Sequence, residues 1–441
     1  MKKAMYDIFQ LPPVTFPKNF LWGSSTASYQ IEGDNVDSYL WHDEQQGKFW
    51  VNDPRITAPS GKAIDHYRLY REDVDLIADL GHQAYRMSLE WSRIEPREGE
   101  WNTEAVAFYI DLLERLNAHG IKPFVTLTHI SYPHWLEQQG GLGKGENLHF
   151  IERYAEYIVP KIAHLVHGWN VLNEFNGGRN PQDIPNKFAL LRAHARGYHV
   201  IKRHSNAPVS TAHAFIHWFP RHYHDPLDRF MTDYIDFMTN EFFFHAIRTG
   251  ELVCPFADAQ FDAEVKGSAD FWAINTYTRH MVDGRSASLE GPRFRHKHIK
   301  MIPMDNFYLE EMYPEGMIAN LERLKDKPVY ITENGCAADD DRFRIVYIAL
   351  HLSALQEAIE RGVDVRGYFY WSTFDNYEWY SFVPRFGLVH VDLETYQRTP
   401  KPSAYFFRDI IQNSGFDQRI LRAYLRELPT IGPDSPIAKG A

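Results

Sequence analysis

Cysteine is scarce in this sequence of 441 residues, which contains only Cys254 and Cys336. Two cysteines cannot build the set of bridges that holds a small disulfide-rich domain together, so that class of protein is excluded. Disulfides persist in oxidising compartments and are rare in the cytosol. The low count therefore favours a reducing, cytoplasmic setting.

Long apolar runs and long basic runs are missing as well. No stretch approaches the roughly 18 apolar residues that a membrane-spanning helix requires, and Asp7 and Gln10 interrupt any signal-peptide core behind Met1. The chain has 58 acidic and 47 basic side chains, which gives a net charge of −11. This balance argues against nucleic acid or an anionic membrane as the main partner. The sequence leaves the oligomeric state open.

One unit recurs along the chain: a helical pattern that ends in glycine, followed by a short apolar run. The pattern at 66–80 is followed by Gly81, and the pattern at 104–119 by Gly120. Glycine readily adopts the left-handed conformation that ends many helices. Helices that alternate with short apolar strands predict a parallel sheet covered by helices. The expected strands are 20–25, 83–89, 122–128, 168–174, 208–213, 271–277, 328–334 and 365–371.

Eight such units predict an α/β fold of the closed (β/α)₈ TIM-barrel type. The alternative is a doubly wound open sheet, but no Gly-x-Gly-x-x-Gly or Walker loop follows any strand. No low-complexity linker divides the sequence, so we expect residues 1–441 to form a single domain with long βα loops. The segment 428–441, rich in proline, glycine and small residues, is expected to be a loosely ordered tail.

Polar residues stand where several of these apolar strands end. In a barrel of this kind, catalytic groups lie at the carboxyl ends of the strands. Two of the strands end in glutamate, and a buried carboxylate is unfavourable unless something there uses it. The polar residues at the strand ends are Arg86, His129, Asn173, Glu174, Asn275, Tyr277, Glu333 and Asn334, with Trp371 ending the last strand.

Two carboxyls in one cleft, without a cluster of metal ligands, fit covalent and acid–base chemistry on a glycosidic bond. Arg86 is a candidate to keep Glu333 ionised, while Glu174, near a second carboxylate, is expected to have a raised pKa and stay protonated. Retention of configuration requires the two carboxyls to stand roughly 5–5.5 Å apart. Such chemistry requires no cofactor and no metal.

Aromatic residues beyond the last strand fit the same interpretation. The segment from Trp371 to Trp379 places two indole rings and the carboxyl of Glu378 close together in the sequence. The flat C–H faces of a sugar stack on such rings, and a carboxylate accepts strong, charge-assisted hydrogen bonds from its hydroxyls.

Taken in order, these motifs resemble family 1 of the glycoside hydrolases, the β-glucosidase family. The resemblance runs from about Phe16 to Tyr405, nearly the whole chain. It implies a retaining β-glycosidase on a (β/α)₈ barrel that acts on small β-glycosides. The stretches that carry it are 20–33, 85–94, 169–174, 330–335, 371–379 and 385–392.

The resemblance also implies roles for individual residues. Glu174 corresponds to the acid/base and Glu333 to the nucleophile. Arg86, Asn275 and Tyr277 correspond to residues that support them. The implied binding residues for the non-reducing sugar, or glycone, are Gln30, His129, Asn173, Trp371, Glu378 and Trp379.

The sequence departs from the family pattern on the side of the leaving group, or aglycone. Ile130 replaces an aromatic residue, Phe175 replaces a proline, and Glu310 replaces a tryptophan. We therefore expect an aglycone preference that differs from that of a cellobiose-cleaving enzyme. Glu378 stands where relatives that act on 6-phosphorylated sugars have a small residue, and its charge would repel a phosphate.

Several alternatives stay open. The same glycone residues suit a β-galactosidase or β-fucosidase, and a barrel that binds sugar without catalysis is the alternative from another class. The histidines between His213 and His224 could suggest a metal, but their spacing fits loop and core histidines better. The basic run 293–300 is expected to be a solvated loop surface that borders the aglycone entrance at most.

Overall fold

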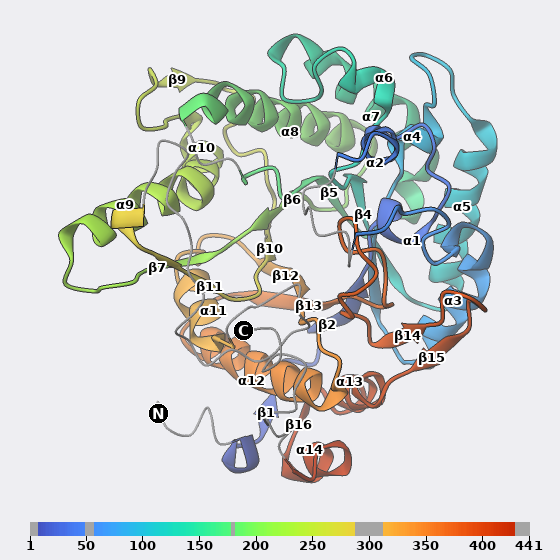
Figure 1. Ribbon diagram of the computed structural model, residues 1–441, viewed down its shortest axis with the longest axis vertical. Coiled ribbons are helices and arrows are strands. Elements are labelled where there is room, and N and C mark those ends of the chain that lie inside the picture. The colour runs from blue at the N-terminus through green and yellow to red at the C-terminus, as the bar shows by residue number, and fades with distance from the viewer. Residues whose placement is uncertain (1–7, 49–56, 178–180, 287–311, 428–441) are drawn as a thin grey trace.

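Eight parallel strands form a closed barrel in the computed structural model, which describes residues 8–48, 57–177, 181–286 and 312–427 (Figure 1). Each strand pairs in parallel with the next, and the last strand returns to the first through the pairing of Gly367 with Leu21. The predicted fold class is confirmed. The order around the barrel is β2-β3-β4-β5-β6-β10-β12-β13.

The barrel strands begin and end within two residues of their predicted bounds. The largest difference is in β10, which ends at Asn275 because the chain then leaves the barrel to form a separate parallel pair, so Tyr277 lies beyond the strand. The bounds are β2 Leu21–Ser25, β3 Ala84–Ser88, β4 Lys122–Thr128, β5 Gly168–Asn173, β6 Val209–Ala214, β10 Trp272–Asn275, β12 Val329–Asn334 and β13 Val365–Trp371.

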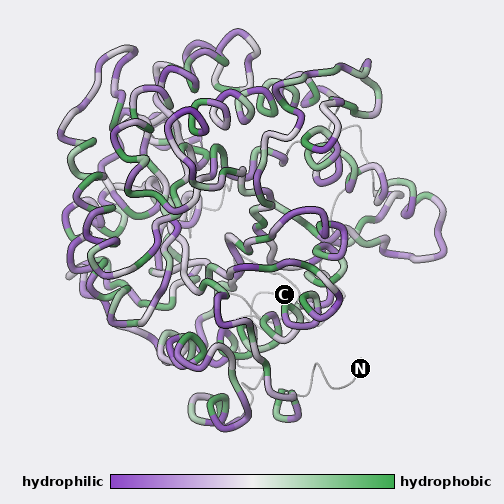
Figure 2. The backbone as a smooth tube through the Cα atoms, turned by 180° about the vertical axis from the view of Figure 1, so that it is seen from behind, coloured by the Kyte–Doolittle hydropathy of each residue, from purple (hydrophilic) through white to green (hydrophobic). Residues whose placement is uncertain are grey.

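An outer layer of helices covers the barrel, and both predicted glycine stops are present, with φ of 73° at Gly81 and at Gly120. The Asn102 side chain caps one of these helices by accepting hydrogen bonds from two backbone N–H groups. Along the outer helices the tube alternates between hydrophobic and hydrophilic residues, as one buried face requires (Figure 2). The helices are α3 His66–Asp79, α5 Thr103–Ala118, α7 Leu148–Ile162, α8 Ile184–His204, α10 Phe242–Thr249, α11 Pro314–Leu321, α12 Asp341–Glu360 and α13 Pro402–Asn413.

Two of the buried apolar clusters in the described part of the chain build the barrel and its covering. The larger cluster lies between the barrel and its helices and includes most buried residues of α5, α7 and α12. The smaller cluster comes from the barrel strands and from Phe271, just before β10, and includes Ala84, Phe124 and Phe369, with the rings of Phe124 and Phe369 5.0 Å apart. We interpret this smaller cluster as the packed interior of the barrel, which supports the polar residues at the carboxyl ends of the strands.

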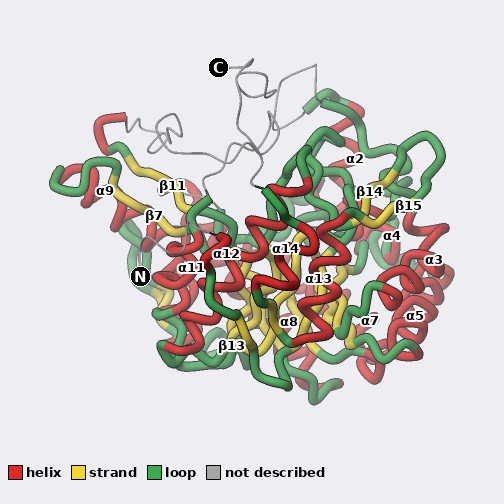
Figure 3. The backbone as a smooth tube through the Cα atoms, turned by 90° about the horizontal axis from the view of Figure 1, so that it is seen from below, coloured by secondary structure: helices red, strands yellow, loops and turns green. Residues whose placement is uncertain are grey.

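Further short elements lie outside the regular strand–helix units. Figure 3 shows α2, α9, β7, β11, β14 and β15 above the strands, on one side of the molecule. They are α1 Ser28–Ile31, α2 Tyr39–Gln45, α4 Trp91–Ile94, α6 His134–Glu137, β7 His217–Pro220, α9 Pro226–Asp236, β11 Arg279–Val282, β14 Val389–Val391 and β15 Arg398–Pro400. A π-helical turn, Phe237–Glu241, joins α9 to α10.

The two described ends of the chain meet. Strand β1 (Val14–Thr15) pairs antiparallel with β16 (Gly415–Phe416), next to α14 (Gln418–Tyr424). A small hairpin of β8 (Glu251–Leu252) and β9 (Gln260–Phe261) completes the strands. Within the described ranges, no helix is long and apolar enough to cross a bilayer. The assignment of 1–441 to one domain stays a prediction, and 428–441 lies outside the described residues.

Candidate active site

The two glutamates stand at strand ends whose pairing with the neighbouring strand is irregular. Glu174 comes directly after β5, and between Asn170 and Asn173 this strand advances three residues while its neighbour β6 advances two. Strand β12 has the same irregularity between Ile331 and Asn334, on either side of Glu333. An extra residue of this kind re-aims the following side chains. Glu174 also has a left-handed backbone, with φ of 48°, which is strained for a residue other than glycine.

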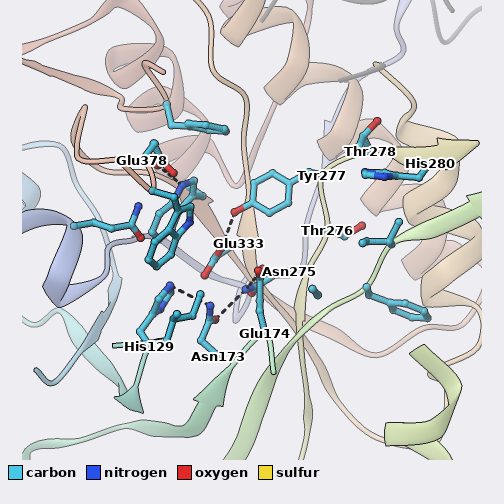
Figure 4. A pocket seen from close by; sticks show the side chains of 18 residues that line it. His129, Asn173, Glu174, Asn275, Thr276, Tyr277, Thr278, His280, Glu333 and Glu378 are labelled. Carbon is cyan, nitrogen blue, oxygen red and sulfur yellow. Dashed lines mark hydrogen bonds between the residues drawn. The ribbon is translucent and has the colours of Figure 1, made fainter. Parts of the chain in front are cut away.

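These strand ends surround one cavity of about 470 Å³. Figure 4 shows Glu174, Glu333, Asn173, Asn275 and His129 converging on it from different strands. The structure thus brings together every site residue predicted from the sequence, and all of them line the cavity except Arg86, which is fully buried and bonds to two of the others. The predicted residues that line it are Gln30, His129, Asn173, Glu174, Asn275, Tyr277, Glu333, Trp371, Glu378 and Trp379.

Two donors hold the carboxylate of Glu333. Arg86 forms a buried ion pair with Oε1, and the hydroxyl of Tyr277 donates to Oε2 at 2.6 Å. Burial and the nearby carboxylates raise the pKa of Tyr277 far above its usual value, so its hydroxyl keeps its proton and remains a donor. Charge-assisted bonds of this kind are about twice as strong as neutral ones. Both carboxylate oxygens are therefore fixed in place.

Glu174 is held by side-chain amides. The Asn275 amide donates to Glu174 Oε1 at 2.8 Å and to Asn173 Oδ1 at 3.1 Å, and it accepts from the hydroxyl of Thr332 at 2.7 Å. Asn173 Oδ1 also accepts from Arg86 at 2.6 Å. Arg86 and the two amides therefore link the carboxyl of Glu174 to that of Glu333 through the wall of the cavity.

His129 is a neutral donor in this arrangement. Its Nε2 accepts from the Asn173 amide at 3.0 Å, which places the ring proton on Nδ1. Burial, together with the charge of Arg86, lowers the pKa of His129 well below its usual value. Among the described residues nothing bonds Nδ1, so this buried donor is available to a ligand.

Glu378 is a third carboxyl of the cavity. It accepts a hydrogen bond from the indole of Trp371 at 2.9 Å. Burial, with a smaller contribution from the charge of Glu333, raises the pKa of Glu378 to about 8. Gln30 lies nearby and donates to Asn376 Oδ1 at 3.1 Å and to the Tyr377 carbonyl at 2.9 Å. In the described part of the chain its own Oε1 has no partner.

The family model for glycosyl hydrolase family 1 matches residues 13–416. This chain belongs to glycosyl hydrolase family 1. It is 31% identical over 456 residues to β-glucosidase A from Thermotoga maritima, covering 91% of this chain and 99% of that protein. The match confirms the resemblance that the sequence motifs indicated, and it identifies the protein as a glycosidase.

Solved structures agree with this placement. A β-glycosidase from Pyrococcus horikoshii superposes on the family 1 glycosidase described here with a TM-score of 0.84 and 34% identity, over 93% of this chain and 98% of that chain. A family 1 β-glucosidase from Thermotoga maritima in complex with isofagomine lactam gives 0.81 and 29%, over 92% and all of the other chain. Family members are therefore known to hold sugar analogues.

Part of the cavity wall of this glycosidase was not predicted from the sequence. Phe386 lies in a motif that resembles the family, so a signal existed for it. Thr276, Thr278 and His280 alternate with Asn275 and Tyr277, out of phase with them, so the polar strand-end pattern did not mark these three. Residues 214–216 had no signal either, because they are apolar themselves and no polar strand end marks them. The unpredicted lining residues are Ile130, Ala214, Phe215, Ile216, Thr276, Thr278, His280 and Phe386.

Two departures from the family pattern meet at a second cavity of about 290 Å³. Ile130 and Glu174 line both cavities, whereas Phe175 lines only the second and packs against Phe243, with ring centroids 5.6 Å apart. The third departure, Glu310, and the basic run 293–300 lie outside the described residues. The second cavity is mostly apolar, with Tyr39, Tyr132, Leu142, Leu172 and Leu190 in its wall.

A structural role explains His213, the histidine of the histidine-rich segment that is fully buried. Its ring stacks on Phe243 at 4.9 Å, and burial lowers its pKa to about 3. Within the described ranges, no group of three or more histidine, cysteine or acidic side chains is arranged to hold a metal ion. The expected absence of a metal stays a prediction.

The electrostatic argument against phosphorylated sugars is weaker than the sequence indicated. With a pKa raised to about 8 by burial, Glu378 carries little charge at neutral pH. The described residues that line the cavity nevertheless include no lysine or arginine. A phosphate would find no cationic side chain in this wall.

Proposed function

We propose that this family 1 glycosidase hydrolyses terminal, non-reducing β-D-glucosyl residues from small glycosides with net retention of configuration. The observation that carries the proposal is the different treatment of two glutamates in one cavity: Glu333 is held by a cation and a phenol, and Glu174 by an amide. Groups of one type in contrasting environments can act as nucleophile and acid in a single site.

In the first step, a carboxylate oxygen of Glu333 attacks the anomeric carbon while the glycosidic bond breaks. Glu174 gives its proton to the departing oxygen, so the leaving group departs as a neutral alcohol. Arg86 and Tyr277 hold the attacking carboxylate in one orientation, which removes the need to order it during the reaction. The product of this step is a glycosyl ester of Glu333.

In the second step, Glu174, now a carboxylate, takes a proton from a water molecule that attacks the anomeric carbon. The ester bond to Glu333 breaks, the sugar is released, and Glu174 is again protonated. Two displacements on the same carbon restore the original β configuration. The roles proposed for the two glutamates, Arg86, Asn275 and Tyr277 are those implied by the sequence.

The proposed glycone residues offer matching hydrogen-bond partners. His129 supplies a neutral donor at Nδ1 and Gln30 an acceptor at Oε1, and both atoms are buried without a described partner. A sugar hydroxyl that reaches these atoms gives each of them a hydrogen-bond partner. Asn173 and Glu378 complete the polar set, and Trp371 and Trp379 provide ring faces for the C–H groups.

The leaving group faces a more apolar surface. Ile130, Phe215, Ile216 and Phe386 line the cavity together with the acid/base Glu174. We therefore propose that efficiency on aryl or alkyl glucosides exceeds efficiency on cellobiose, whose leaving group is a polar sugar. Equal or higher kcat/KM on cellobiose would contradict this part of the proposal.

A β-galactosidase or β-fucosidase activity is the second candidate. One relative, named β-galactosidase from Pyrococcus woesei, is 28% identical over 93% of this chain and its own full length. A panel of nitrophenyl β-glucoside, β-galactoside and β-fucoside separates the candidates, because the highest kcat/KM identifies the preferred glycone.

Labelling with a 2-deoxy-2-fluoro-β-glucoside that carries a good leaving group tests the proposal. The fluorine slows both steps, and the good leaving group restores the first, so the ester accumulates. Mass spectrometry of the digest should find one sugar on the peptide that contains Glu333. A label elsewhere, or an α-configured product, would overturn the assignment. A barrel that only binds sugar would take no label, and Glu333→Gln would leave its binding unchanged.

The proposed chemistry uses no cofactor, since a proton activates the leaving group and a carboxylate stabilises the sugar cation. The proposed partner is a small β-glycoside. Cytoplasmic location stays a prediction from composition.

A further inference from the structure

Glu44, on helix α2, is a buried carboxyl outside the cavity. Its residue exposure is 5%, and it accepts four hydrogen bonds. The hydroxyls of Tyr29 and Tyr377 donate to Oε1 at 2.8 and 2.9 Å. The backbone N–H and the hydroxyl of Ser60 donate to Oε2 at 2.9 and 2.8 Å. One side chain thus joins three segments that are distant in the sequence.

Two of these partners are the immediate neighbours of proposed glycone residues. Tyr29 precedes Gln30, and Tyr377 precedes Glu378. The two segments are also bound directly, because the Tyr377 N–H donates to the Gln30 carbonyl at 3.1 Å and the Gln30 amide donates to the Tyr377 carbonyl at 2.9 Å. Glu44 therefore joins this pair of segments from outside the cavity, since it is not among the described lining residues.

The surroundings make this contact rigid. Tyr29, Leu40, Tyr377 and Tyr380 form a separate buried cluster around it. The Tyr377 hydroxyl also lies 2.7 Å from the Ala58 carbonyl, so its one proton is shared between that oxygen and Glu44. Burial of this kind makes an unpaired carboxyl unfavourable, so the four donors and the acid depend on one another.

Helix α2 extends the same support to a third glycone segment. The hydroxyls of Ser38 and Ser131 lie 2.9 Å apart, and the Tyr39 N–H donates to the Tyr132 carbonyl at 3.1 Å. Ser131 stands two residues after His129. Helix α2 is thus bound to the segments that carry Gln30, Glu378 and His129.

A carboxyl suits this position better than an amide. Burial raises the pKa of Glu44, and the four hydrogen bonds oppose that rise. All four partners can donate, and a carboxylate has only acceptors. Glutamine in the same place would present an N–H₂ group either to the backbone N–H of Ser60, which cannot accept, or to the two phenols, whose hydroxyls would then have to turn their protons away from it.

We propose that Glu44 is a positioning residue that sets Gln30 and Glu378 for the glycone before substrate arrives. This inference rests on the glycone roles given to those two residues under the proposed function. The Glu44 carboxylate acts through Tyr29 and Tyr377 and does not touch the sugar. Removing it should loosen both residues at once and weaken recognition of the glycone without altering the chemistry at Glu333.

Binding of deoxynojirimycin, measured by calorimetry, tests the proposal without requiring turnover. We expect Glu44→Gln to lower affinity about tenfold or more, as expected when a buried network loses a partner. Tyr377→Phe and Tyr29→Phe, which remove single hydroxyls, should show smaller losses. These two variants keep the test open if Glu44→Gln does not fold. For nitrophenyl β-glucoside the loss should fall mainly on KM rather than on kcat.

Glu95→Gln is the matched control. Glu95 is equally buried and accepts from the Trp91 indole and the Gly99 N–H, both at 2.8 Å, and from Arg153, but it does not line the cavity. This variant should lose thermal stability and keep its affinity for deoxynojirimycin. An equal loss of affinity in Glu95→Gln would assign the effect of Glu44 to general destabilisation and overturn the proposal.

A double-mutant cycle supplies the readout that a merely structural role would not change. In a Glu378→Gln background, Glu44→Gln should cost much less affinity than in the native protein, because the residue it positions is already impaired. Fully additive losses, or unchanged affinity in a folded Glu44→Gln, would overturn the inference. A native protein that neither binds glycone analogues nor cleaves any glycoside would instead overturn the proposed function itself.

Discussion

Glu174 and Glu333 occupy equivalent places in the barrel and have opposite surroundings. Each stands at the end of a parallel strand that gains an extra residue against its neighbour, and both line one cavity. Glu333 receives a guanidinium and a phenol, whereas Glu174 receives an amide from Asn275. The backbone irregularity is therefore the same at both strand ends, and the hydrogen-bond partners distinguish the two glutamates.

The contrast teaches that position alone does not assign a role to a carboxyl. A cation stabilises the ionised form of its neighbour, and an amide donor is neutral. The network also joins the two sides, since Asn173 accepts from both Arg86 and Asn275. A substitution among the partners of one glutamate is therefore expected to affect the other glutamate as well, but less strongly.

Glu333→Gln should produce the largest loss. Without a nucleophile no glycosyl ester forms, so kcat should fall by about 10⁵-fold or more with every leaving group, good or poor. Steady-state rates on nitrophenyl and dinitrophenyl β-glucosides provide the measurement. A residual rate that rises sharply with the better leaving group would indicate that the two glutamates have exchanged roles.

Glu174→Gln should produce a loss that depends on the leaving group. A general acid contributes about 10²–10⁴-fold, and it matters less when the leaving group needs no proton. We expect a large fall with alkyl glucosides and nearly normal glycosylation with dinitrophenyl β-glucoside, seen as a pre-steady-state burst of dinitrophenol. Equal losses on both substrates would remove the distinction between the two residues.

Tyr277→Phe weakens only one of the two contacts that hold Glu333. Loss of a buried hydrogen bond to a charged group should reduce kcat/KM by about 10- to 100-fold. Tyr198→Phe is a matched control, because the Tyr198 hydroxyl donates to Asp270 at 2.9 Å and Tyr198 is not among the described residues that line the cavity. It should leave kcat/KM within about threefold of the native value. A Tyr277→Phe enzyme of native activity would show that Arg86 alone suffices.

A third carboxyl in the same cavity, that of Glu378, extends the comparison, and the change in affinity expected from it is the smallest of the four effects. Glu378 has a pKa of about 8, so it is mostly protonated below that pH and ionised above it. The ionised form accepts stronger bonds from sugar hydroxyls, and affinity for neutral isofagomine lactam should rise about fivefold between pH 7 and pH 9. Calorimetry should find a smaller rise in Glu378→Gln, and an identical profile would contradict the assignment.

The strands were predictable because their signals are local. The barrel strands are short runs, most of them apolar and some directly behind a helix stop, and the predicted bounds differ from the observed ones by no more than two residues. The polar strand ends were predictable for the same reason. The motifs then supplied Gln30 and Glu378, which no periodicity indicates.

Features that depend on two distant segments were not predictable. The extra residues in β5 and β12 exist only relative to the neighbouring strands. Glu44 bonds Tyr29 from 15 residues away and Tyr377 from 333, and nothing near it in the sequence marks it as different from a surface acid. Burial by tertiary contact gives these residues their importance.

The pairing of β1 with β16 has a consequence for how the molecule comes apart. Val14 lies opposite Phe416, and the Thr15 N–H donates to the Gln356 side chain at 3.0 Å, so the first and last described segments are joined to each other and to α12. The fold is thus closed by two pairings: β13 with β2 in the barrel, and β1 with β16 outside it. Because β1 and β16 are antiparallel, a force that pulls the two ends of the chain apart would break the backbone hydrogen bonds of this pair one at a time, in a zipper geometry. This pair would separate before the force acted on the barrel strands.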